Sequence, residues 1–105
     1  MTDELSTEID DRGAEVVITL AGELDFGTNT DFFEAVQPLA EAGRTLILDL
    51  DQLAFCDSSG LGSLVRLHQL TEAAGGSLAL TRVPGQLEAT IKMTMLHKLL
   101  TIRGD

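Results

Sequence analysis

Larger uncharged residues alternate with polar ones in the segment 5–9 (LSTEI), near the start of the chain. This period of two is typical of a β-strand with one buried face, and the turn-forming run 10–13 (DDRG) follows it directly. The next segment, 15–21 (EVVITLA), is apolar on both faces, as in a strand placed deeper in a sheet. The pattern therefore predicts an opening β-hairpin whose second strand ends at Gly22.

An amphipathic helix is predicted between Thr28 and Gly43, because apolar residues recur there at helical spacing. Thr28 is expected to cap its start by accepting a backbone N–H, and Asp31 places an acidic side chain in the first turn. Pro38 lies within the pattern and removes one helical hydrogen bond, so we expect the helix to bend or break there. Gly43 marks its end.

The second half of the chain predicts further strands and helices. An apolar run at 45–50 (TLILDL) suits a central strand, and after a seven-residue connection a long helix follows over 58–74. The run 77–81 (SLALT) predicts another strand, and a last helix begins after Pro84. A short closing strand can follow near 100–102.

The residues of these two helices that should face the core are mostly aliphatic. They are Leu61, Leu64, Val65, Leu67 and Leu70 in the long helix, and Leu87, Ile91 and Met95 in the last one. The order strand, strand, helix, strand, helix, strand, helix indicates an α/β fold, in a single domain over 1–105.

Composition narrows the class of protein. The 105 residues are 44% hydrophobic but only 4% aromatic, which predicts one compact domain with an aliphatic core and no second domain. A formal net charge of −10 argues against binding to a phosphate backbone or to an anionic bilayer. Nucleic acid is therefore not an expected partner.

The sequence shows neither a secretory signal nor an apolar stretch long enough for a membrane span. Cys56 is its one cysteine, so it can form no internal disulfide and has no companion for a zinc site. We therefore expect a cytoplasmic protein that is not inserted in a membrane and holds no metal or other cofactor.

The segment 55–62 (FCDSSGLG) combines residue types that suit chemistry at a helix start. It lies beyond the carboxyl end of the predicted central strand, where open α/β sheets place their working residues. Asp57 and Ser58 are good N-cap residues, whereas Gly60 and Gly62 each cost roughly 1 kcal/mol of helix stability relative to Ala. Something other than helix propensity favours the two glycines.

Two interpretations of this segment stay open. It is either a helix cap only, or a site for a phosphate group, since the N–H groups and dipole at a helix start stabilise anions. A phosphoserine would add about −1.5 to −2 charges there without unfolding the domain.

Asp25 would emerge at the same edge as Ser58 if its strand and the central strand are parallel neighbours. It could then orient the serine hydroxyl or contact a partner; alternatively, it is a solvated turn residue.

These residues together resemble the STAS family of anti-sigma factor antagonists. The resemblance rests on 22–25 (GELD) followed by Thr28, on 49–50 (DL) and on 55–62, and it spans nearly the whole chain. The sequence departs from the family at 94–96 (TML), where a glycine often precedes a leucine, so the boundary of the last helix stays open.

The resemblance implies a small mixed sheet of four to five strands flanked by helices. It implies that Ser58 is phosphorylated by a partner that is both an anti-sigma factor and an ATP-dependent serine kinase. The unphosphorylated protein would bind that partner and free a sigma factor, and phosphorylation would block this binding until a phosphatase removes the group. The partner-binding residues would be Asp25, Asp57, Ser58, Ser59, Gly60, Leu61 and Gly62.

The main alternative is a STAS-like accessory subunit of a larger assembly, such as a transporter complex, in which the same surface docks permanently. Such a subunit needs neither a hydroxyl at position 58 nor a kinase.

Enzymatic functions find little support in the sequence. A serine hydrolase needs a G-x-S-x-G elbow, but Cys56 stands two residues before Ser58. His68 and His97 are more typical of surface or packing residues than of a catalytic base or a metal ligand. A nucleotide site would need the lysine of a phosphate-binding loop or a G-x-G-x-x-G run, and the sequence has neither. A redox role for Cys56 is also not expected, because the negative charge of Asp57 disfavours its thiolate. We therefore expect a binding protein and not an enzyme.

Overall fold

The computed structural model describes residues 5–103. Its elements follow the predicted order and include the closing strand. They are β1 (Leu5–Asp11), β2 (Glu15–Leu24), α1 (Asn29–Glu41), β3 (Thr45–Cys56), α2 (Ser58–Ala73), β4 (Ser77–Thr81), α3 (Gly85–Met93), the short 3-10 helix η1 (Leu96–Lys98) and β5 (Thr101–Arg103).

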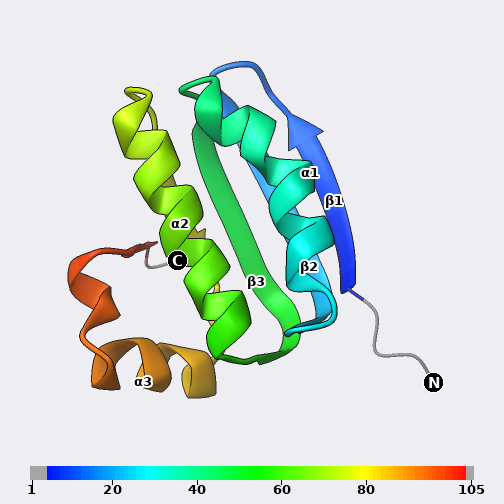
Figure 1. Cartoon of the computed structure of the whole chain (residues 1–105), viewed down its shortest axis with the longest axis vertical. Helices are drawn as coiled ribbons and strands as arrows, with labels where there is room; N and C mark the ends of the chain where they lie inside the picture. The colour runs from blue at the N-terminus through cyan, green and yellow to red at the C-terminus, as the bar shows by residue number, and fades with distance from the viewer. Residues whose placement is uncertain (1–4, 104–105) are drawn as a thin grey trace.

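The five strands form one mixed sheet in the order β1-β2-β3-β4-β5 (Figure 1). β1 and β2 pair antiparallel, as expected for the opening hairpin, and the other three pairs are parallel. The predicted α/β fold with a mixed sheet flanked by helices is therefore confirmed. So is the parallel pairing of β2 with β3, on which the expected placement of Asp25 depends.

The core lies between the sheet and the helices α1 and α2, which run over one face of it (Figure 1). Alternate strand residues point into this layer and are almost fully buried: Val16, Ile18, Leu20, Leu46, Leu48, Leu50, Leu78 and Leu80. The helices add Phe32, Phe33, Val36, Leu61, Leu64 and Leu67, and Val65 and Leu70 pack half-buried against them. Each fully buried Leu, Ile, Val or Phe stabilises the fold by about 1.5–3 kcal/mol, which makes this layer the main source of stability.

β1 lies at the edge of the sheet, and its predicted buried face is only partly covered. Leu5 and Thr7 are half-buried, but Ile9 is 45% exposed. The expectation that Ile9 would be buried was wrong, because Ile9 belongs to the edge strand β1, which lies at the margin of the helical layer (Figure 1).

Both central strands are longer than predicted. β2 continues through Gly22 to Leu24, and β3 runs on to Cys56, so that Asp57 alone separates it from α2. The predicted seven-residue connection was wrong. The pairing of β2 with β3 shifts register twice, and at each shift β3 has one residue more than β2. These two β-bulges keep the polar stretch after Leu50 within the sheet. Gly22 has φ +114° at the second shift, which a side chain would not tolerate easily.

Pro38 does not break α1, which continues to Glu41. The residue is exposed and stands in the last turn, so its missing N–H removes one bond close to the helix end. Its carbonyl still accepts the N–H of Ala42, and Gly43, with φ +75°, ends the helix as predicted.

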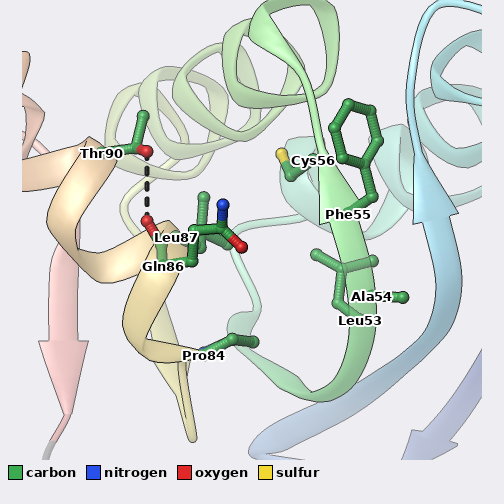
Figure 2. Close-up of a pocket in the computed structure, with 8 residues that line it drawn as sticks. All are labelled: Leu53, Ala54, Phe55, Cys56, Pro84, Gln86, Leu87 and Thr90. Carbon is green, nitrogen blue, oxygen red and sulfur yellow. Dashed lines mark hydrogen bonds between the residues drawn. The ribbon is translucent and has the colours of Figure 1, made fainter.

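α3 packs beside the second half of β3 and leaves an open pocket of about 230 Å³ between them (Figure 2). The lining residues carry no charge: Leu53, Ala54, Phe55, Cys56, Pro84, Gln86, Leu87 and Thr90. On the inner side of α3, Leu87 and Ile91 are buried as expected.

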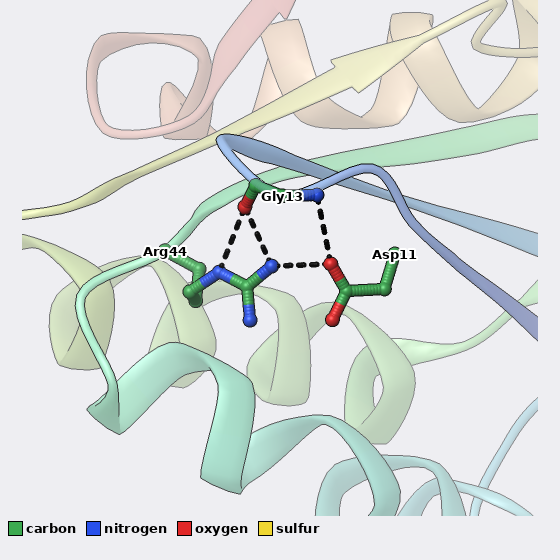
Figure 3. Close-up of polar contacts among 3 residues, drawn as sticks. All are labelled: Asp11, Gly13 and Arg44. Atoms are coloured by element: carbon green, nitrogen blue, oxygen red, sulfur yellow. Dashed lines mark hydrogen bonds and ion pairs between the residues drawn. The ribbon is translucent and has the colours of Figure 1, made fainter.

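A cluster of polar contacts ties the β1–β2 turn to the start of β3 (Figure 3). The Arg44 guanidinium donates to the carbonyl oxygen of Gly13 and to the carboxylate of Asp11, which also accepts the N–H of Gly13. These bonds to Arg44 and to the Gly13 N–H hold the pKa of Asp11 below its usual value. The hairpin is thereby fixed to β3 at the end of the sheet opposite to the carboxyl ends of β2 and β3.

Met95 does not extend the buried face of α3. The helix ends at Met93, and Met95 is 53% exposed with φ +64°, in the left-handed region. A β-carbon makes this conformation unfavourable by roughly 1–2 kcal/mol, which explains why a glycine suits this position.

We therefore expect Met95→Gly to raise the free energy of unfolding by roughly 0.5–1 kcal/mol, after the entropy that glycine adds to the unfolded chain is subtracted. Urea unfolding followed by circular dichroism measures this. Met95→Ala is the matched control, because it removes the exposed side chain but keeps the β-carbon, and it should give no gain. A glycine variant no more stable than the alanine variant would contradict the explanation.

Candidate functional site

The site lies where β2 and β3 end side by side. Leu24 and Cys56 are paired as the last residues of the two strands, and the N–H of Asp57 donates to the carbonyl oxygen of Leu24 over 3.1 Å. The turn that follows β2 therefore meets the first turn of α2, as expected for parallel neighbours.

The Asp57 carboxylate joins these two segments. One oxygen, Oδ1, accepts the N–H of Gly60 over 3.0 Å, which makes Asp57 the N-cap of α2. The other, Oδ2, accepts the N–H of Phe26 over 3.1 Å. The helix cap predicted from the sequence is thus present, and the same side chain also holds the β2–α1 turn.

Asp25 closes its own turn. Its Oδ1 accepts the N–H groups of Gly27 and Thr28 at 2.9 and 3.1 Å. Thr28 faces back into this turn, because its hydroxyl accepts the N–H of Asp25 and donates to the carbonyl oxygen of Glu23. The predicted side-chain cap of α1 by Thr28 was therefore wrong. Among the described residues, no hydrogen bond joins Asp25 to Ser58, so Asp25 closes its turn and does not orient the serine hydroxyl; its contact with a partner stays a prediction.

Ser58 is the first residue of α2 and its side chain is exposed to solvent. Within residues 5–103 its hydroxyl makes no hydrogen bond, and the backbone N–H groups of Ser58 and Ser59 find no acceptor. Ser59 is half-buried. Ser58 is thus the more accessible of the two hydroxyls, and it stands beside two free N–H groups at the positive end of a helix dipole.

The two glycines of this turn have different surroundings. A β-carbon on Gly60 would lie 2.6 Å from both the carbonyl oxygen and Cγ of Leu24, and 3.1 Å from Sγ of Cys56. Gly60 is therefore required for α2 to approach the end of β2. A β-carbon on Gly62 would meet nothing within 4 Å, and Gly62 is exposed.

Leu61 and Cys56 fix the inner side of the site. Leu61 is buried in the core, and Cys56 points toward α3 (Figure 2). Burial, and secondarily the charge of Asp57, raise the pKa of the Cys56 thiol to about 12. The thiol is thus protonated at neutral pH, in agreement with the expectation that its thiolate is not favoured beside Asp57.

Two exposed aromatic residues at this edge were missed by sequence analysis. Phe26, in the β2–α1 turn, is 83% exposed, and Phe55, near the end of β3, is 52% exposed. Neither belongs to a periodic apolar pattern that would assign it to the core. The only available signal was that Phe26 stands within a turn sequence, between Asp25 and Gly27.

Within residues 5–103, no group of three or more His, Cys, Asp or Glu side chains could hold a metal ion. In the same part of the chain, no helix is long and apolar enough to cross a membrane. His68 lies in the middle of α2, well beyond Ser58 at the start of the same helix, and His97 lies in η1.

Comparison with known proteins identifies relatives that match over nearly their whole length. The STAS domain family matches residues 5–105. The anti-sigma-B factor antagonist of Bacillus subtilis is 28% identical, over 93% of this chain and 90% of its own length. The anti-sigma F factor antagonist of Paenibacillus polymyxa is 29% identical, over 93% of this chain and 86% of its own.

Among solved structures, the Bacillus cell fate determinant SpoIIAA in its phosphorylated form has the same fold. It superposes with a TM-score of 0.74 at 23% identity, covering 93% of this chain and 91% of its own.

Replacing the two glycines separately tests the packing of the site. We expect Gly60→Ala to lower the free energy of unfolding by about 2 kcal/mol or more, because the added methyl group overlaps the backbone of Leu24. Gly62→Ala is the matched control, and we expect it to raise that free energy by up to about 1 kcal/mol, through better helix propensity alone. Urea unfolding measures both. Equal effects of the two variants would contradict the close approach at Gly60.

Proposed function

The chain belongs to the STAS domain family, and we propose that it is an anti-sigma factor antagonist controlled by phosphorylation of Ser58. In its unphosphorylated form it binds an anti-sigma factor that is also a serine kinase, and so frees a sigma factor. Phosphorylation of Ser58 blocks this binding, and a phosphoserine phosphatase restores it.

The state of Ser58 is the observation that carries the proposal. A phosphoacceptor must present a hydroxyl that another protein can reach, and Ser58 is exposed and has no hydrogen-bond partner among residues 5–103. The alternative interpretation, a helix cap only, does not account for Ser58, because Asp57 already supplies the cap. The names of the two relatives, both anti-sigma factor antagonists, support the same function.

The position of Ser58 allows the charge to change while the fold stays intact. A phosphate there would lie near the free N–H groups of Ser58 and Ser59, which partly offset its two negative charges. The Asp57 carboxylate is nearby and adds repulsion, so the surface becomes strongly anionic and strongly hydrated. A partner that buries this surface would have to remove the water from a dianion, which opposes binding.

The proposed partner surface consists of Asp25, Asp57, Ser58, Ser59, Gly60, Leu61 and Gly62. Leu61 is buried in the free chain, so it would act by supporting the turn and not by direct contact. Gly62 is exposed and costs helix stability without relieving any overlap, which is consistent with a partner that comes close to the backbone there.

The protein acts in the cytoplasm as a binding protein and not as an enzyme, and it controls transcription without contacting DNA. The net charge of −10 supports the last point, because it disfavours approach to nucleic acid. The alternative of a permanent accessory subunit is less well supported, because this chain spans nearly the full length of the antagonists it matches.

Phosphorylation of purified variants tests the proposal. We expect incubation with ATP and an anti-sigma kinase from the source organism to add one phosphoryl group to the wild type. Ser58→Ala should accept none, and Ser59→Ala, the matched control, should accept one. The readout is intact-protein mass. The proposal fails if none of that organism's anti-sigma kinases modifies the wild type, or if Ser58→Ala is modified as well as the control.

A further inference from the structure

Phe26 is one of the few aromatic residues of this chain, and it is almost fully exposed. The protein has four phenylalanines and neither tryptophan nor tyrosine, and Phe26 leaves 83% of its surface in water. Met93, at the end of α3, is equally exposed. Covering an exposed aromatic ring stabilises a complex, because apolar surface is removed from water. Aromatic residues are accordingly enriched at the centres of protein interfaces.

The backbone beneath the ring is held firmly. The N–H of Phe26 donates to Asp57 Oδ2 over 3.1 Å, and its carbonyl oxygen accepts the side-chain amide of Asn29 over 3.2 Å. The bonds of Asp25 to Gly27 and Thr28 close the rest of the turn. The ring is therefore presented on an ordered turn, so little backbone entropy is lost when a partner binds it.

A partner that docks over Ser58 with an interface of typical size would extend to Phe26. A typical interface buries about 800 Å² per partner, which corresponds to a disc of roughly 16 Å radius. Phe26 is hydrogen-bonded to Asp57, the residue directly before Ser58, so it lies well inside such a disc. Phe26 and Ser58 thus belong to one continuous surface.

The negative charges around Phe26 indicate which kind of partner surface would fit it. Asp25 and Asp31 flank the turn, Asp57 lies beneath it, and the chain as a whole is strongly acidic. The complementary surface is an apolar pocket with a basic rim. A second copy of this chain fits poorly, because it would bring the same carboxylates together.

We propose that Phe26 is the anchor by which the anti-sigma kinase recognises this chain, with its ring inserted in an apolar, basic-rimmed pocket beside the phosphotransfer site. The inference rests on the proposed function. Phe26 does not touch the reacting atoms in this proposal; its role is to determine which kinase binds.

Binding and phosphorylation of Phe26→Ala test this inference, with Met93→Ala as the matched control of equal exposure. Both variants should keep the wild-type unfolding curve, because neither side chain is packed. For Phe26→Ala we expect the Kd of the ADP-loaded kinase to rise at least about tenfold, and the KM for phosphorylation to rise with little change in kcat. Phe26→Leu should recover part of the affinity, and Met93→Ala should match the wild type.

The outcomes separate this inference from the proposed function. Wild-type phosphorylation at Ser58 with unchanged affinity for Phe26→Ala would overturn the anchor and leave the switch intact. A loss of self-association in Phe26→Ala, seen by analytical ultracentrifugation with unchanged kinase binding, would overturn it in favour of a second copy as the occupant. If the wild type is neither bound nor phosphorylated, the proposed function and the anchor fail together.

Discussion

The Asp57 carboxylate holds the candidate site together, and the rest of the site depends on it. One oxygen caps α2 and the other fixes the turn that carries Asp25 and Phe26. Both bonds require the ends of β2 and β3 to coincide, which the two register shifts in β3 achieve. They also require α2 to start close against Leu24, which Gly60 permits. A single side chain thus links strand register, helix position and the shape of the surface.

This arrangement suits a switch that acts on a surface and leaves the core unchanged. The residues that stabilise the domain lie between the sheet and the helices α1 and α2, whereas Ser58 is exposed to solvent. Adding a dianion at Ser58 changes electrostatics and hydration where a partner would bind, and it disturbs no packed side chain. The pocket between β3 and α3 is lined by Cys56 and by other uncharged residues, and Ser58 is not among them. The proposed phosphorylation of Ser58 therefore does not involve this pocket.

Local patterns predicted the elements better than their ends. β2, α2 and β4 were found because their apolar residues are regularly spaced, and the cap at Asp57 was found because residue type alone indicates it. The second half of β3 was missed because it holds Asp51 and Gln52, and only the pairing with β2 keeps it in the sheet. The bond from Phe26 to Asp57 spans 31 positions, so no local pattern contains it. Thr28 was misjudged for a different reason: its hydroxyl bonds to Asp25 and Glu23, which precede it, and not to the first turn of the helix.

The most direct test of this account is calorimetry of one anti-sigma kinase, loaded with ADP, against the unphosphorylated chain and the same chain phosphorylated at Ser58. We expect the kinase to bind the unphosphorylated chain and phosphorylation to weaken binding at least about a hundredfold, because a hydrated dianion must be buried beside Asp57. Equal affinity for the two forms would contradict it.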